Sequence, residues 1–229
     1  MLKKILFSSI ATMSLMADVS LSEFRDIKLF EKSGIKLQKA IDLGSLYMID
    51  ARAVTNRRVS DFNVFVTKDK KIAIIGNGMD LNSSKPLFIP KDMTQYEKDA
   101  SFVVGDGKKK FYLFTDPECP YCKKFEKLMP KYLKQAKFFV YFFPLDNHKN
   151  AKNISIWIDS QKNKFDAMLK SANDEAKGYD KLSKETIAKY EDRLMKQMDI
   201  AIELGVGGTP SLFDENGGAV AWNEIESHL

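Results

Sequence analysis

The sequence predicts an α/β protein preceded by a small β-rich section. Three observations predict this class. An apolar run with strand propensity at residues 111–114 leads into a helical pattern, a second buried strand follows at residues 138–143, and a strand pair with a short helix closes the chain. Hydrophobic residues make up 44% and charged residues 29% of the 229 residues. Because such a mixture can bury a core, disorder over the whole chain is excluded.

Residues 1–17 are typical of a signal peptide for export. Two lysines precede an apolar run over residues 5–16, Ala17 ends the run, and a charged residue follows at once. The run is too short to cross a bilayer, and no stretch of about 18 apolar residues follows it. A buried N-terminal helix is the alternative. Export would place the cysteines in an oxidising compartment, where disulfides persist.

Residues 18–86 form the predicted front section. Helical spacing of apolar residues marks residues 18–34, and a strand is expected at residues 46–49. The apolar runs at residues 64–67 and 72–75 are separated by a charged turn, which indicates a hairpin. So few apolar strands make a thin core, and we therefore expect this section to self-associate.

Residues 87–107, with prolines near their start and a charged middle, are predicted to be a linker to the second domain at residues 108–229. The helix after the cysteines is expected to kink at Pro130. Residues 147–204 have a helical pattern. Asn223, with a glutamate three residues later, has the spacing of a capping box for a short last helix.

The charge balance argues against nucleic acid as a partner. Lysine and arginine number 36 against 31 aspartates and glutamates, the signs are mixed, and loss of residues 1–17 lowers the net charge from +5 to +3. The only histidines, His148 and His228, have no metal-ligand spacing to the cysteines, so no metal site is expected. We interpret His148 as an ordinary loop residue and His228 as part of a frayed end.

The motif Cys119-Pro120-Tyr121-Cys122 carries the chemistry. It follows a strand, opens a helix and contains the only cysteines of the chain. Two residues between cysteines in a first helical turn bring both sulfurs within bonding reach, and the helix N-terminus favours a thiolate at the first. We expect Cys119 to be the exposed nucleophile and Cys122 the shielded thiol that resolves the mixed disulfide. Pro120 suits the first turn because it has no N–H.

The cysteine pair has two other interpretations. An inert disulfide across two residues would close so small a loop that it would restrict the unfolded chain very little. A metal pair would need two further ligands. Both are less favoured than a redox-active dithiol.

Thr209-Pro210 is the second candidate element. It follows a glycine-rich turn at residues 205–208 and precedes a strand. A cis bond at Pro210 is expected there, which would expose the backbone of Thr209 beside the cysteine pair. An exposed edge of this kind can take up an extended peptide. A plain turn is the alternative.

These motifs resemble the DsbC/DsbG group of periplasmic thiol:disulfide interchange proteins. The stretches that carry the resemblance are Phe114-Thr115-Asp116, Cys119-Pro120-Tyr121-Cys122-Lys123-Lys124, Gly205-Val206-Gly207-Gly208-Thr209-Pro210, Ile156-Trp157, Asn163-Lys164-Phe165-Asp166, Phe65-Val66-Thr67 and Ile75-Gly76-Asn77-Gly78-Met79-Asp80-Leu81. The resemblance implies a thioredoxin-like fold with a helical insertion at about 147–204 and a homodimer held by residues 18–86. It also implies an active site of Cys119 and Cys122, supported by Pro120, Tyr121, Thr209 and Pro210.

The resemblance further implies an enzyme of the periplasm that isomerises or reduces wrong disulfides in exported proteins. Electrons would come from a membrane thiol reductase, and no cofactor beyond the redox-active Cys119–Cys122 disulfide is implied. Pro120 stands where the isomerase has glycine, as in glutaredoxins, and this dipeptide tunes redox poise. A periplasmic disulfide oxidase with a quinone-linked membrane partner is therefore the first alternative. A holdase chaperone with incidental cysteines is the second.

Overall fold

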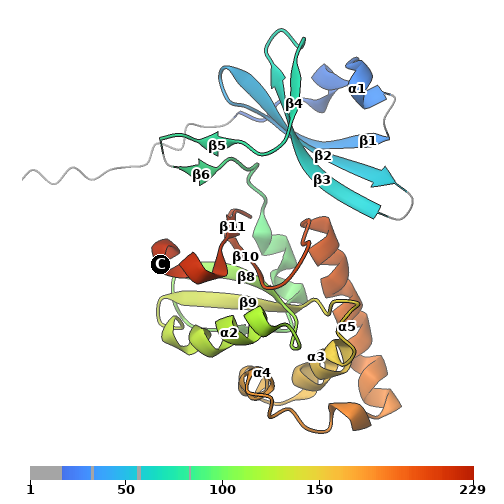
Figure 1. Ribbon diagram of the computed structural model, residues 1–229, viewed down its shortest axis with the longest axis vertical. Helices are drawn as coiled ribbons and strands as arrows, with labels where there is room; N and C mark the ends of the chain where they lie inside the picture. The colour runs from blue at the N-terminus through green and yellow to red at the C-terminus, as the bar shows by residue number, and fades with distance from the viewer. Residues whose placement is uncertain (1–16, 32–33, 56–57, 83) are drawn as a thin grey trace, which may run out of the picture. The chain divides into compact units, whose positions relative to one another are not determined.

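The computed structural model describes residues 17–31, 34–55, 58–82 and 84–229 (Figure 1). The chain divides into two compact units, Met1–Ile89 and Pro90–Leu229, each described here by itself. The predicted signal peptide covers residues 1–17. Of these, only Ala17 belongs to the residues that the structure describes. Among the described residues, no helix combines the length and the apolar character needed to cross a membrane.

The front unit is built on an antiparallel sheet. Its strand order is β1-β2-β3-β4, from β1 (Ile35–Asp42), β2 (Leu46–Thr55), β3 (Arg58–Thr67) and β4 (Ala73–Ile75). Val64 pairs with Ile75, which confirms the predicted hairpin. Strand β1 is not predicted from the sequence, because a bulge between Leu37 and Lys39 breaks its alternation of apolar and polar residues.

Both faces of this sheet bury apolar side chains, and successive residues of a strand point to opposite faces. The region expected to be helical forms two short pieces, η1 (Leu21–Phe24) and α1 (Lys28–Glu31), and their phenylalanines pack on the face that carries Ile49 and Val64. The opposite face carries Met48 and Phe65. A small second sheet, β5 (Met79–Asp80) with β6 (Lys85–Pro86), follows in the chain.

The second unit has a mixed sheet in the order β11-β10-β8-β9-β7. Its strands are β7 (Phe102–Val104), β8 (Lys109–Thr115), β9 (Ala136–Phe142), β10 (Ser211–Asp214) and β11 (Ala219–Val220). The central strands β8 and β9 are parallel, and α2 (Pro120–Leu128) lies between them in the chain. The remaining pairs are antiparallel. The α/β class predicted from the sequence is confirmed.

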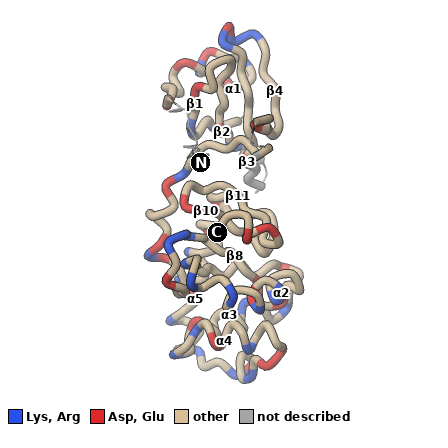
Figure 2. Tube along the Cα trace, turned by 90° about the vertical axis from the view of Figure 1, so that its left-hand side faces the viewer, with Lys and Arg blue, Asp and Glu red and all other residues tan. Residues whose placement is uncertain are grey.

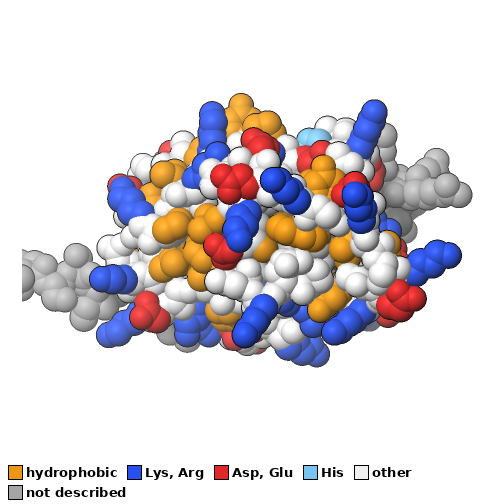
Figure 3. Space-filling view, turned by 90° about the horizontal axis from the view of Figure 1, so that it is seen from below, with side chains coloured by type: hydrophobic (Ala, Val, Ile, Leu, Met, Phe, Trp, Pro, Cys, Tyr) orange, Lys and Arg blue, Asp and Glu red, His pale blue; other side chains and the backbone are white. Residues whose placement is uncertain are grey.

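Helices cover both faces of this sheet (Figure 1). Phe111 and Leu113 of β8 face one cluster, which includes side chains of α2, α3 (Ala151–Ser160) and α4 (Lys164–Ala172). Tyr112 and Phe114 face the other, with the 3-10 helix η2 (Met93–Asp99) and the last turns of α5 (Lys184–Glu203). Between α4 and α5 lies the short η4 (Tyr179–Lys181). Figure 2 shows acidic and basic residues interleaved along the trace, and Figure 3 shows apolar side chains among charged ones on one surface.

Three details differ from the sequence predictions. The predicted linker is largely folded, because Met93 and Tyr96 of η2 are buried in the second unit and β7 joins its sheet. The helix at Pro130 does not merely kink: α2 ends at Leu128 and continues as a 3-10 turn. The last helix, η5 (Trp222–His228), has no capping box, since Glu226 accepts hydrogen bonds from the side chains of Lys131 and Tyr132 instead.

Candidate active site

The cysteine pair lies at the junction between β8 and α2. Thr115 ends β8, residues 116–119 form the connecting loop, and α2 begins at Pro120 with Cys119 as its N-cap. Pro120 occupies the first helical position, where no intrahelical N–H donor is needed. This local arrangement is the one predicted from the sequence, because strand, proline and helical pattern are all encoded within a few residues.

Cys119 is more enclosed than the sequence analysis predicted. Only 5% of the residue is exposed, so the expectation of an openly accessible thiol is wrong in degree. The reason is the Thr209–Pro210 segment beside it: the Cys119 thiol donates a hydrogen bond to the Thr209 carbonyl oxygen over 3.3 Å. The Thr209–Pro210 bond is cis, as predicted. The structure thus brings together two predicted elements that are 90 residues apart in the chain.

Cys122 is fully buried one turn further along α2. The Asp116 backbone N–H donates to its sulfur over 3.4 Å. Burial raises the pKa of the Cys122 thiol strongly, and the nearby Thr115 hydroxyl lowers it only in part. The predicted shielding of this cysteine is confirmed, and both cysteines are free thiols in this structure.

Glu126 is a site residue that the sequence analysis missed. Its side chain is buried, Oε1 accepts a 2.6 Å hydrogen bond from the Thr115 hydroxyl, and Oε2 has no hydrogen-bond partner among the described residues. Burial raises the pKa of Glu126 to about 7, although the Thr115 hydrogen bond opposes this. The available signal was its spacing, because residues four apart on a helix share a face and Glu126 lies four after Cys122.

Asp116 and His148 form a second feature that the sequence analysis missed. The Asp116 side chain is completely buried, and its Oδ2 lies 2.8 Å from Nδ1 of His148. His148 is therefore not an ordinary loop residue, as the sequence analysis interpreted it. Its partner is 32 residues away in the chain, and no local pattern indicates such a pairing.

Aromatic side chains flank the cysteine pair on the surface. Tyr121 is 58% exposed, its ring centroid lies 6.4 Å from that of Trp222, and the Lys124 ammonium lies over the Tyr121 ring. Trp222 also contacts Phe125 of α2 edge-on. This places an aromatic surface, able to contact an apolar peptide, within the motif itself.

The described residues contain no group of three or more histidine, cysteine, aspartate or glutamate side chains that could hold a metal ion. What the site offers is a pair of thiols one helical turn apart, a carboxyl group that titrates near neutral pH, and a backbone carbonyl facing the first sulfur. Such an arrangement can exchange disulfides, since thiolate attack and proton transfer are the two requirements of that chemistry.

Comparison with known proteins places this site in a recognised domain. The model of the thioredoxin-like domain matches residues 96–224, more than half of the chain. No curated protein matches the chain. Among solved structures, a disulfide interchange protein from Neisseria gonorrhoeae is similar at 20% identity, with a TM-score of 0.47, covering 58% of this chain and 96% of its own.

Two further solved structures are similar at low identity. The catalytic domain of Proteus mirabilis ScsC has 22% identity and a TM-score of 0.44, and covers 59% of this chain and 93% of its own. Helicobacter pylori DsbG has 15% identity and a TM-score of 0.39, and covers 81% of this chain and 97% of its own.

Proposed function

Because the chain belongs to the thioredoxin-like domain family, we propose that it is a thiol-disulfide oxidoreductase whose Cys119–Cys122 pair isomerises or reduces wrong disulfides in exported proteins. The observation that carries the proposal is the environment of this pair. Cys119 is the N-cap residue of α2 and its thiol donates to the Thr209 carbonyl, while the Cys122 thiol is buried one turn further along the helix, near a carboxyl group.

The reaction begins at Cys119. Its thiolate attacks one sulfur of a substrate disulfide, the substrate S–S bond breaks, and the released substrate sulfur leaves as a thiolate that takes up a proton. The helix N-terminus favours the attacking thiolate, because unpaired backbone N–H groups point toward the capping residue. The product of this step is a mixed disulfide between Cys119 and the substrate.

The mixed disulfide can then resolve in two ways. In isomerisation, another substrate thiolate attacks the substrate sulfur of the mixed disulfide and returns Cys119 to its reduced form. In reduction, the Cys122 thiolate attacks the Cys119 sulfur and the substrate leaves as a dithiol. The enzyme then carries a Cys119–Cys122 disulfide until a reductant of the thiol class reduces it back to the dithiol. The second route needs a proton acceptor for Cys122, whose thiol is hard to ionise in its buried position.

Glu126 is suited to accept that proton. Its unpaired Oε2 is buried on the same helix face as Cys122. Since the pKa of Glu126 is about 7, comparable fractions of the molecules carry the protonated and the ionised carboxyl group near neutral pH. A group in this state can take a proton from Cys122 and return it when the enzyme disulfide is reduced again.

The proposed compartment is the periplasm, and the proposed source of electrons is a membrane thiol reductase. Support comes from the signal-peptide pattern of residues 1–17 and from the need of an isomerase for reduced Cys119. If the pair is mainly oxidised in the cell, the same site works as an oxidase.

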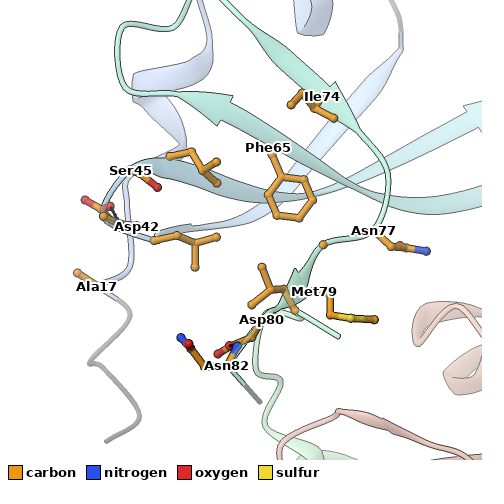
Figure 4. A pocket seen from close by; sticks show the side chains of 14 residues that line it. Ala17, Asp42, Ser45, Phe65, Ile74, Asn77, Met79, Asp80 and Asn82 are labelled. Carbon is orange, nitrogen blue, oxygen red and sulfur yellow. Dashed lines mark hydrogen bonds between the residues drawn. The ribbon is translucent and has the colours of Figure 1, made fainter. Parts of the chain in front are cut away.

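The front unit is proposed to hold a homodimer. Three isoleucines are each more than half exposed: Ile72, which directly precedes β4, and Ile74 and Ile75 within it. A cleft of about 950 Å³ opens beside them, where Phe65 lies between Ile74 and Met79 (Figure 4). A second copy would cover this apolar edge, because β4 pairs with β3 on one side only in the described sheet.

Four measurements test the proposal. Trapping thiols in intact cells gives the redox state of the pair: mainly reduced supports isomerase or reductase, and mainly oxidised supports oxidase. Recovery of scrambled ribonuclease activity measures isomerisation, and Cys119→Ser is its control. A holdase would suppress aggregation equally well with either residue at position 119.

Light scattering tests the dimer, which Ile74→Lys should convert to monomer. A wild-type chain that is monomeric at all concentrations contradicts the dimer.

A further inference from the structure

We propose that His148 is a positioning residue for this site. Through Asp116 it holds the loop that carries Cys119, and its protonated form makes Cys119 more reactive than an uncharged side chain would. The inference rests on the proposed function only in assigning Cys119 the attacking role, since the geometry of the pair stands by itself.

Asp116 joins two loops that are distant in the chain. Its Oδ1 accepts hydrogen bonds from the backbone N–H groups of Glu118, over 2.7 Å, and Cys119, over 3.2 Å. Its Oδ2 accepts one from the Leu145 N–H over 2.7 Å and lies 2.8 Å from His148 Nδ1. One carboxylate therefore fixes the approach to Cys119 and ties it to the loop after β9.

A second contact fastens the same two loops independently. The Glu118 carboxylate accepts hydrogen bonds from the backbone N–H of Asn150, over 2.6 Å, and from its side-chain amide, over 3.1 Å. Loss of the His148 ring therefore leaves the loops joined, and we expect variants at this position to fold.

The charge of His148 matters because Asp116 is fully buried. A thiolate at Cys119 adds a second negative charge close to the Asp116 carboxylate, and like charges disfavour each other's ionised forms. An imidazolium at His148 compensates the carboxylate. The ring is about 20% exposed, so it can exchange its proton with solvent.

Other charged groups lie on and beside the two loops, among them Lys123 of α2, which pairs with Asp174. Glu118 lies on the Cys119 loop, and Asp146 and Lys149 lie on the loop of His148. In the first turn of α3, Lys152 pairs with Glu191 of α5. Of the groups near the cysteines, Glu126 titrates near neutral pH. Its contribution is common to wild type and His148 variants, so a comparison between them isolates His148.

The test is the pH profile of Cys119 alkylation in the reduced full chain, read by mass spectrometry from pH 5 to 9. His148→Leu removes both the hydrogen bond and the charge, and should move the midpoint upward by about one pH unit. His148→Asn retains an N–H donor for Asp116 without a charge. Because it lacks the charge of an imidazolium, it should react at least about threefold more slowly than wild type at the acidic end of the range.

The matched control is His228→Leu, which removes the other histidine of the chain and should leave the profile unchanged. The inference is overturned if His148→Leu has the wild-type profile, or if His148→Asn follows wild type at every pH. Reduction of insulin disulfides, measured on the same samples, separates the two proposals. A wild-type protein that does not reduce insulin overturns the proposed function, whatever the alkylation profile shows.

Discussion

The two units of the chain bury different kinds of side chain. The front unit encloses almost only apolar residues between its sheet and short helices, yet leaves the isoleucines of β4 exposed. The second unit closes its apolar core on both faces of its sheet and also buries Thr115, Asp116 and Glu126 beside the cysteines. Burial of ionisable groups costs stability, and such groups gather where chemistry needs them. We therefore expect the front unit to serve the proposed assembly and the second unit the proposed reaction.

The largest expected effect separates these assignments most sharply. Cys119→Ser should reduce insulin-disulfide reduction to the uncatalysed rate, because no other cysteine reaches the surface. Ile74→Lys in the front unit should leave this reduction unchanged while it prevents dimerisation. A large loss of insulin reduction in Ile74→Lys would contradict the division of labour.

A smaller effect concerns the stability of each unit. Phe114→Ala removes a fully buried ring stacked on Tyr141 and should lower the free energy of unfolding by about 3–5 kcal/mol. Ile74→Ala, at a position that is 59% exposed, should change it by less than about 0.5 kcal/mol in dilute monomer. Tryptophan fluorescence follows the second unit alone, because Trp157 and Trp222 are the only tryptophans. Far-UV circular dichroism in urea follows both units, and equal destabilisation by the two variants would contradict this prediction.

The third prediction concerns Glu126 and pH. Its folded-state pKa of about 7 lies above the ordinary value of 4.5, so the folded state holds its proton more tightly and loses stability as pH rises from about 4.5 to 7. Glu126→Gln should therefore raise the free energy of unfolding by up to about 3 kcal/mol at pH 8 and by little at pH 4.5. Urea unfolding at both pH values measures this. The exposed Glu224→Gln is the control, and a gain that is equal at both pH values would refute the role of buried charge.

In the proposed mechanism, Glu126→Gln should also slow the release of substrate from the mixed disulfide. Without a carboxylate to accept the Cys122 proton, the mixed disulfide should persist longer, and a covalent complex with substrate should accumulate on non-reducing gels. A variant that is more stable at pH 8 and slower to release substrate would show that this buried group serves reactivity at the expense of stability.

The parts of the structure that the sequence predicts are those encoded locally. The strand before Cys119, the proline at the first helical position and the hairpin at residues 64–75 depend on neighbouring residues, and all are found. The cis bond at Pro210 was also predicted, from its glycine-rich approach and the strand that follows.

What the sequence does not reveal depends on contacts between distant segments. His148 meets Asp116 across 32 residues, and the enclosure of Cys119 results from a carbonyl 90 residues away. The buried state of Glu126 depends on helix α2 packing against the sheet, since a glutamate in a lysine-rich helix is otherwise expected at the surface.

The exposed edge of the front sheet also bears on aggregation. Residues 72–75 form a short run of high β-propensity and no charge, of the kind that pairs with other chains and seeds aggregates. Lys68, Lys70 and Lys71 precede this run directly. Such flanking charges repel a second incoming strand and act as gatekeepers against uncontrolled growth. The three lysines pair with Asp42, Glu23 and Asp69, so the repulsion they exert on another strand comes from the net positive charge of this turn, and salt weakens it.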